Sequence, residues 1–141
     1  MGRLRGAVSD DDAGSVLLLT IGYAMLAVAL VLVCVDATSL YLAQKRLDAV
    51  ADAAALAGAD GFTFDVVDGR PVATLTDEAV TEQAEAIVRA VGSVSIVDAS
   101  TPDGVSARVT VTARWRPPVT SLFVPEGVVI ESTATSRTGF D

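Results

Sequence analysis

The chain has 141 residues, enough for one modest domain with an appendage, and it carries a formal net charge of −8. An acidic chain without a basic patch repels phosphate, which argues against nucleic acid as a partner. Histidine is absent, which excludes His-based catalytic triads and the HExxH zinc motif, and a single cysteine excludes an intramolecular disulfide. The sequence also lacks a Gly-rich phosphate loop, so we predict no catalytic residue, no cofactor and no metal site.

Residues 1–12 form a short polar tail that ends in three consecutive aspartates, at 10–12. Consecutive acids point in different directions and lack the alternating spacing of a calcium loop, so we interpret them as a solvated charge run. Residues 13–35 contain no charged side chain, and this run of 23 residues is long enough to cross a ~30 Å hydrocarbon core as a helix. Asp36 ends the run and is expected at the far interface of the membrane, because a carboxylate within the bilayer is costly.

A cleaved secretory signal and a core helix of a soluble protein explain the apolar run less well than a membrane span does. A secretory signal has a shorter apolar region and a small-residue exit site. A core helix of a soluble protein would need more chain to cover it than the remaining residues supply. The sequence therefore predicts a membrane span at 13–35.

The orientation of this span does not follow from charge. Arg3 and Arg5 precede the run, and Lys45 and Arg46 follow it, so the positive-inside count is balanced. We expect the short tail in the cytoplasm and the larger C-terminal part on the other side of the cell membrane.

Residues 36–59 predict a helical stalk that continues the span, because they contain no proline and no glycine before Gly58. Apolar residues recur there in steps of three and four, which is a heptad pattern. The six positions are Leu40, Ala43, Leu47, Val50, Ala54 and Ala57. This stripe predicts a helix-packing seam, either against a partner helix or against the chain's own C-terminal domain. Span and stalk together would form one helix of about 65 Å at 1.5 Å per residue.

The stalk carries a family resemblance. Its string Ala-Asp-Ala-Ala-Ala-Leu-Ala-Gly-Ala at 51–59, the Leu-Tyr-Leu step at 40–42 and the Val-Asp end of the span resemble the TadE/TadG-like proteins, accessory components of the tight-adherence (Flp) pilus system. The resemblance covers residues 13–59, and the 51–59 string is its specific part. It implies an anchored protein with its C-terminal part outside the cytoplasm, association with other pilus or secretion proteins, and no enzymatic activity.

The same resemblance implies a processing candidate. Some relatives are cut by a prepilin peptidase after a glycine, with glutamate at the fifth mature position. Gly14 is the candidate glycine here, but Leu19 stands where the glutamate should be. Gly14 is therefore a weak cleavage candidate and is better explained as a small residue at the membrane edge. The missing glutamate also argues against a major, polymerising pilin.

Residues 60–141 predict a small extracytoplasmic α+β domain. A hairpin is expected over 61–75 with its turn at 68–71, and then a helix from a cap at Thr76 or Asp77 to Gly92. A short strand at 94–97 and a turn at 101–104 follow.

The alternation over 105–114 gives the clearest strand of the chain. An apolar excursion is expected at 120–124 and a last strand at 128–138. Trp115 has three candidate roles: a cation–π contact with the neighbouring arginines, a membrane-interface anchor, or packing beside Pro117. The predicted fold class is α+β, with a long N-terminal transmembrane-plus-stalk helix followed by a small antiparallel sheet packed on a helix, as in pilins.

These observations predict a non-enzymatic, single-pass, minor pilin-like accessory component of a Tad/Flp-type pilus assembly or secretion apparatus in the cell membrane. Its expected partners are the membrane and other pilus or secretion proteins, bound through the stalk helix. The alternative is a single-pass membrane sensor or adhesion protein whose outer domain binds a ligand. An enzyme that uses two facing carboxylates would need a cleft, for which a domain this small offers little room.

Overall fold

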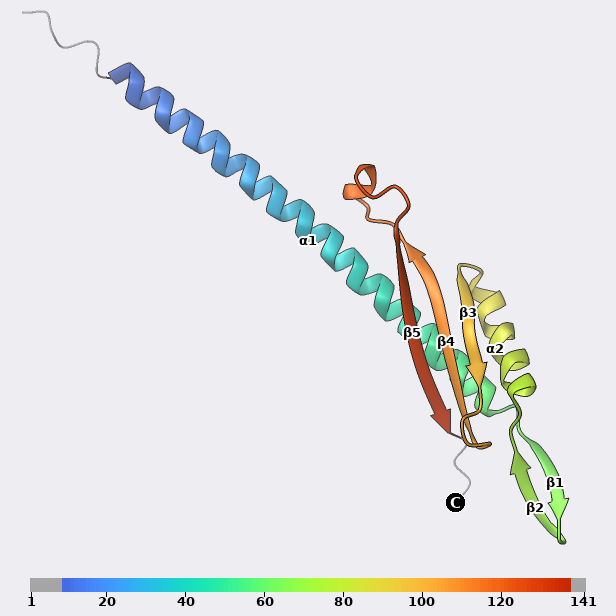
Figure 1. The fold of residues 1–141 in the computed structure, drawn as a ribbon. Coiled ribbons are helices and arrows are strands. Elements are labelled where there is room, and N and C mark those ends of the chain that lie inside the picture. Colours follow the sequence, from blue (N-terminus) through green and yellow to red (C-terminus); the bar gives the residue numbers. More distant parts are fainter. Residues whose placement is uncertain (1–8, 138–141) are drawn as a thin grey trace, which may run out of the picture.

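The computed structural model describes residues 9–137 and confirms the predicted α+β class (Figure 1). In chain order the elements are α1 (Ser9–Ala59), β1 (Thr63–Val67), β2 (Arg70–Thr74), α2 (Asp77–Val91), β3 (Val94–Ser100), β4 (Ser106–Trp115), the 3-10 helix η1 (Thr120–Leu122) and β5 (Val128–Arg137). Thr138, the expected last residue of the final strand, lies outside the described residues.

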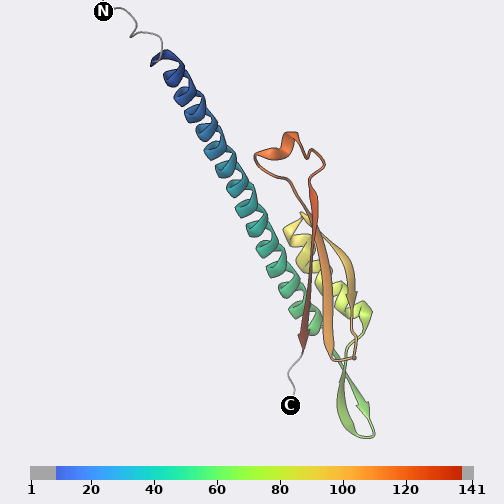
Figure 2. The same cartoon turned by 60° about the vertical axis from the view of Figure 1, so that its left-hand side comes forward.

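The long helix α1 runs without a break from Ser9 to Ala59, across the predicted boundary between span and stalk. At 1.5 Å per residue its length is roughly 75 Å. Residues 9–12 of the predicted tail form its first turn. An 18-residue window of α1 has a mean hydropathy of 2.7, and none of this window is buried within the molecule. The N-terminal half of α1 therefore stands free of the domain, as both ribbon views show (Figures 1 and 2).

The main sheet has the strand order β3-β4-β5, with both pairs antiparallel. The register of β4 and β5 is regular along their whole length, from Ser106 opposite Arg137 to Trp115 opposite Val128. A register shift between Ile96 and Asp98 interrupts the other pair. Pairing resumes after this shift, at Asp98, so the strand predicted at 94–97 is longer than expected and reaches Ser100.

Two helices cover one face of this sheet: α1 packs on β4 and β5, and α2 packs on β3. The predicted alternation of β4 is confirmed, because Ala107, Val109 and Val111 are fully buried while Arg108 is exposed. The core is built from small side chains, and Gly58 of α1 is buried among them, close to Val80 of α2 and Ala107 of β4. A Cβ added at Gly58 would lie 3.0 Å from Val80 Cγ1 and 3.2 Å from the Ala107 Cβ, so glycine allows the two helices to approach more closely than a larger residue would without a shift.

The second helix begins and ends where the sequence predicts. Thr76 is its N-cap, with Oγ1 accepting a hydrogen bond from the Ala79 amide at 3.3 Å. Gly92 closes the helix in the left-handed region at φ 75°. Local chemistry accounts for both caps, and a long-range hydrogen bond from the Thr101 amide to Asp77 Oδ1 at 2.7 Å also holds the start of the helix.

The predicted hairpin is confirmed as β1 and β2, joined by the two residues Asp68 and Gly69. Both have positive φ, 51° and 76°, as a type I′ turn requires. The hairpin projects from the end of the domain farthest from the start of α1 (Figure 1).

Candidate assembly site along the long helix

The first junction between helix and domain is made by Asp36, the residue that ends the apolar run. Its carboxylate accepts hydrogen bonds from the amides of Val119 and Thr120, at 3.0 and 3.1 Å, and from the Thr120 hydroxyl at 2.6 Å. The side chain is buried, and all three donors come from the loop between β4 and β5. Hydrogen bonds to a charged acceptor are the stronger kind, so Asp36 ties this loop firmly to α1.

One helical turn further along, the single tryptophan makes a second contact with α1. Trp115 Nε1 donates a hydrogen bond to the Ser39 hydroxyl at 3.2 Å, and the indole ring is half-buried. Pro117 is buried close by in the chain. Of the three candidate roles for Trp115, the structure supports packing at the junction, beside the end of the apolar run.

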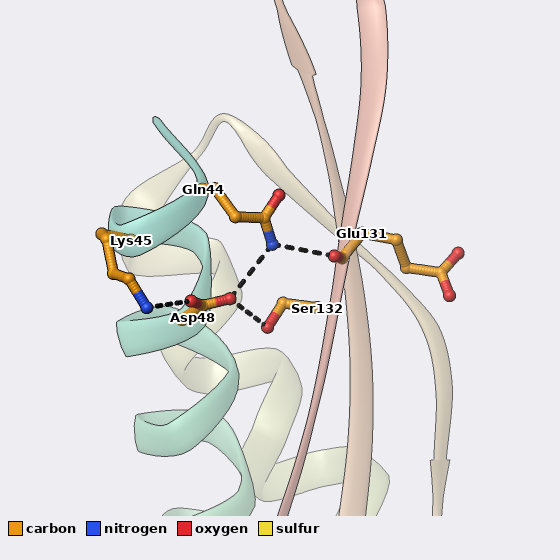
Figure 3. Close-up of polar contacts among 5 residues, drawn as sticks. All are labelled: Gln44, Lys45, Asp48, Glu131 and Ser132. Atoms are coloured by element: carbon orange, nitrogen blue, oxygen red, sulfur yellow. Dashed lines mark hydrogen bonds and ion pairs between the residues drawn. The ribbon is translucent and has the colours of Figure 1, made fainter. Parts of the chain in front are cut away.

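Asp48 is the centre of a third junction (Figure 3). Its carboxylate accepts hydrogen bonds from the Ser132 hydroxyl at 2.7 Å and from Gln44 Nε2 at 3.1 Å, and Lys45 Nζ lies at 3.3 Å. Gln44 also donates to the backbone carbonyl of Glu131 at 3.0 Å. The hydrogen bond from Ser132, followed by that from Gln44, lowers the pKa of Asp48.

The two aspartates fix the domain at two heights on the same helix. They are twelve residues apart, which corresponds to about 18 Å along the axis. Asp36 holds the loop that follows β4, while Asp48 holds the middle of β5. The geometry therefore prevents the domain from sliding along α1 or rotating around it.

The predicted seam faces the chain's own domain. Leu47 and Ala54 are buried, and the other four positions, Leu40, Ala43, Val50 and Ala57, are half-buried. Leu47 and Ala54 belong to the core that also contains Val80 and Val109.

Sequence reasoning missed several residues of this contact. Ala51, Ala55, Gly58 and Ala59 are all buried, but the heptad pattern does not include them. An ideal helix repeats every 3.6 residues, so the buried stripe drifts away from a strict heptad. The run of small residues at 51–59 was the available signal, because small side chains allow backbones to approach closely.

The face of α1 opposite this contact is open. Leu42, Ala49, Ala53 and Leu56 are exposed, and their spacing of seven, four and three residues puts them on one side of the helix. Lys45 lies beside this face and stands 5.8 Å from the centre of the Tyr41 ring. The exposed Arg46 lies on this face as well, four residues after Leu42 and three before Ala49, so the open face is apolar except for this one cation. It runs on from the apolar N-terminal half of α1.

The remaining candidate residues lie on the free half of the helix. Gly14 is exposed within α1, with no heavy atom within 4 Å of the point that a Cβ would occupy, and its cleavage stays a prediction. Cys34 is exposed and unpaired. Among residues 12–137, whose side chains the structure describes, no group of three or more His, Cys, Asp or Glu side chains is arranged to hold a metal ion.

A family model described as "Putative Flp pilus-assembly TadE/G-like" matches residues 14–61, about a third of the chain. No curated protein and no solved structure matches the chain. The match covers the apolar half of α1, the two junction aspartates Asp36 and Asp48, and the alanine-rich segment at 51–59, but none of the domain residues that these contact. The resemblance of this segment to the TadE/TadG-like proteins is therefore confirmed over residues 14–61.

Proposed function

We propose that this protein is a non-enzymatic, membrane-anchored accessory component of a Tad/Flp-type pilus assembly or secretion apparatus, of the minor pilin-like kind. The observation that carries the proposal is the TadE/G-like match over the segment that joins span and domain. It supports a role associated with Tad pili. The free apolar half of α1 supports a single membrane anchor, because an unburied window of this hydropathy is stable only in lipid or against a partner.

In this proposal residues 13–35 cross the cell membrane, residues 1–12 lie in the cytoplasm and residues 60–141 lie outside it. The stalk at 36–59 stands on the outer side, because it packs against the extracytoplasmic domain. The chain provides no imidazole for acid–base chemistry. Among the described residues, hydrogen bonds lower the pKa of Asp36, Asp48 and Asp103, whose carboxylates act as acceptors at junctions and turns. These features favour a structural component over an enzyme.

The open face of α1 is the surface that we assign to a pilus or secretion partner. The seam itself is covered by the chain's own sheet, so a partner helix would meet Leu42, Ala49, Ala53 and Leu56 instead. Small and apolar side chains at this spacing allow close helix–helix packing.

The experiment uses full-length protein expressed in cells that contain a Tad/Flp assembly. The wild-type chain should remain in the membrane fraction after a high-salt wash and should co-purify with the secretion ATPase and platform proteins. Leu56→Arg should abolish co-purification without unfolding the domain, because Leu56 is exposed. Glu78→Arg, an exposed charge change on α2, is the matched control and should have no effect.

Two results would end this proposal. A full-length chain recovered as a stable monomer without detergent would refute the anchor. A membrane-bound chain that never co-purifies with assembly proteins, but is stabilised by a small ligand, would instead favour the sensor or adhesion alternative. N-terminal sequencing of the same membrane fraction decides whether cleavage follows Gly14.

A further inference from the structure

The loop between β4 and β5 exposes the most accessible large apolar side chains of the outer domain. Residues 117–125 contain no charged side chain. Leu122 and Phe123 stand next to each other at its tip and are 89% and 85% exposed. A pair of large apolar residues held in water at a loop tip is costly, and exposed apolar clusters mark contact sites with proteins or membranes.

The position of this loop is fixed relative to the end of the apolar run. Asp36, the first residue after the run, holds Val119 and Thr120 by three hydrogen bonds. Phe123 is three residues beyond Thr120, so it can lie at most about 11 Å away. The interfacial layer on each side of a bilayer is roughly 5–8 Å thick. The loop tip is therefore within reach of the interfacial layer that would surround Asp36.

Both ribbon views show the loop on the side of the domain that faces the free half of α1. It extends past the end of β4 toward the N-terminal part of the helix, away from the β1–β2 hairpin (Figures 1 and 2). Trp115 lies at the base of the loop, beside Ser39, one turn from Asp36.

The fold holds the loop at both ends. Pro117 is buried at its start. At its end Gly127 is packed so closely that an added Cβ would lie 2.5 Å from the Trp115 carbonyl oxygen, and Arg114 donates to the Glu126 carbonyl. Because both ends are fixed, only the short tip has to be ordered on contact, which limits the entropic cost of binding.

We propose that residues 117–125 form a second membrane contact, in which Leu122 and Phe123 insert into the interfacial layer of the same bilayer that holds the span. The inference rests on the proposed membrane anchor. The chain has a net charge of −8, so apolar burial drives this contact and electrostatic attraction to anionic lipid does not. The contact should therefore form equally well in zwitterionic lipid and at high salt.

The test is fluorescence quenching in full-length protein reconstituted into phosphatidylcholine vesicles, with part of the lipid brominated near the top of the acyl chain. Trp115 is replaced by phenylalanine, and one tryptophan is then introduced by F123W, V66W or Y23W. Phe123, Val66 and Tyr23 are all exposed, so each can accept the larger ring. Val66 lies on the distal hairpin and serves as the matched exposed apolar control, while Tyr23 reports on the span.

We expect bromolipid to quench the F123W and Y23W proteins strongly and to leave the V66W protein unchanged. Quenching of Y23W alone would overturn the second contact and leave the anchor intact. Absence of quenching in all three would refute the anchor itself. A blue-shifted F123W emission without quenching would mean that a protein covers the loop, which also overturns the proposal.

A second set of variants keeps Trp115, in case its replacement by phenylalanine prevents the domain from folding. Cys34 is replaced by serine, and F123C, V66C or Y23C carries an environment-sensitive NBD label in a chain that keeps Trp115. A blue shift for F123C and Y23C, but not for V66C, supports the lipid contact. An NBD emission at F123C that matches V66C overturns it.

Discussion

Leu47 is the α1 side chain on which the contact between the long helix and the sheet depends most. It is 2% exposed and belongs to the main core. Leu47→Ala removes three carbon atoms from a position between the helix and β-strands. At about 0.8 kcal/mol per buried CH₂, the lost transfer free energy alone is about 2.4 kcal/mol.

The cavity left by this substitution adds to the loss. Leu-to-Ala changes in cores cost about 2–5 kcal/mol, and the larger values occur where the surroundings cannot collapse. The core neighbours Ala51 and Ala54 have no rotamers with which to fill the space. We therefore expect the free energy of unfolding to fall by about 3 kcal/mol, roughly a hundredfold in the unfolding equilibrium.

The assay is denaturant titration of full-length protein in detergent micelles, followed by the fluorescence of Trp115. This residue is the only tryptophan, and it reports on the junction because it is half-buried against α1. Leu56→Ala is the matched control: the same atoms are removed from the same helix, at a position 59% exposed. It should change stability by no more than about 0.5 kcal/mol. Equal losses in the two variants would show that α1 does not pack on the sheet through this face.

Three other predictions concern the outer domain. Hydrogen bonds from the amide of Val105 and then from the Ser106 hydroxyl lower the pKa of Asp103 below its ordinary 3.8. The ionised Asp103 carboxylate therefore stabilises the fold fully above pH 3.8, and this stabilisation is lost as pH falls through the lower pKa of the folded state. In the Asp103→Asn variant the free energy of unfolding should therefore fall less steeply at acid pH than in the wild type. Gly92→Ala should lower the free energy of unfolding by about 1–2 kcal/mol, because its left-handed backbone is strained for alanine. Gly127→Ala should lower it by roughly 1–3 kcal/mol more, because the added Cβ would also meet the Trp115 carbonyl of β4. Thermal unfolding of the two variants measures this difference. Ser132→Ala removes the main hydrogen-bond donor to the Asp48 carboxylate and should raise the pKa of Asp48. Carboxyl NMR titration measures this pKa, and an unchanged value would contradict the hydrogen bond drawn in Figure 3.

Elements whose ends depend on local chemistry were predictable from the sequence. The Asp68-Gly69 turn, the Thr76 cap and the Gly92 stop each act through their own backbone, so a single sequence contains the information. The strict alternation of β4 was equally clear. The length of β3 was not, because the register shift after Ile96 interrupts its alternation.

The junctions were not predictable in the same way. Asp36 and Thr120 are 84 residues apart, as are Asp48 and Ser132, and nothing local pairs them. Asp36 was therefore predicted only as the boundary of the span. The sequence predicted the apolar stripe on the stalk. A heptad pattern does not tell whether such a stripe packs on a partner helix or on the chain's own domain. Only the tertiary structure shows that β4 and β5 pack on the side of α1 that carries the stripe.

The unbroken passage of α1 through residues 35 and 36 has a mechanical consequence. A chain with a flexible linker there would let the domain swing independently of its anchor, whereas this helix acts as a stiff lever with no hinge. Residues 36–59 extend about 36 Å along the axis, so a change in tilt of about 20° would displace the far end by roughly 12 Å. In the membrane-anchored protein that we propose, a pull at the distal end of the domain would be transmitted to the lipid as a change in tilt.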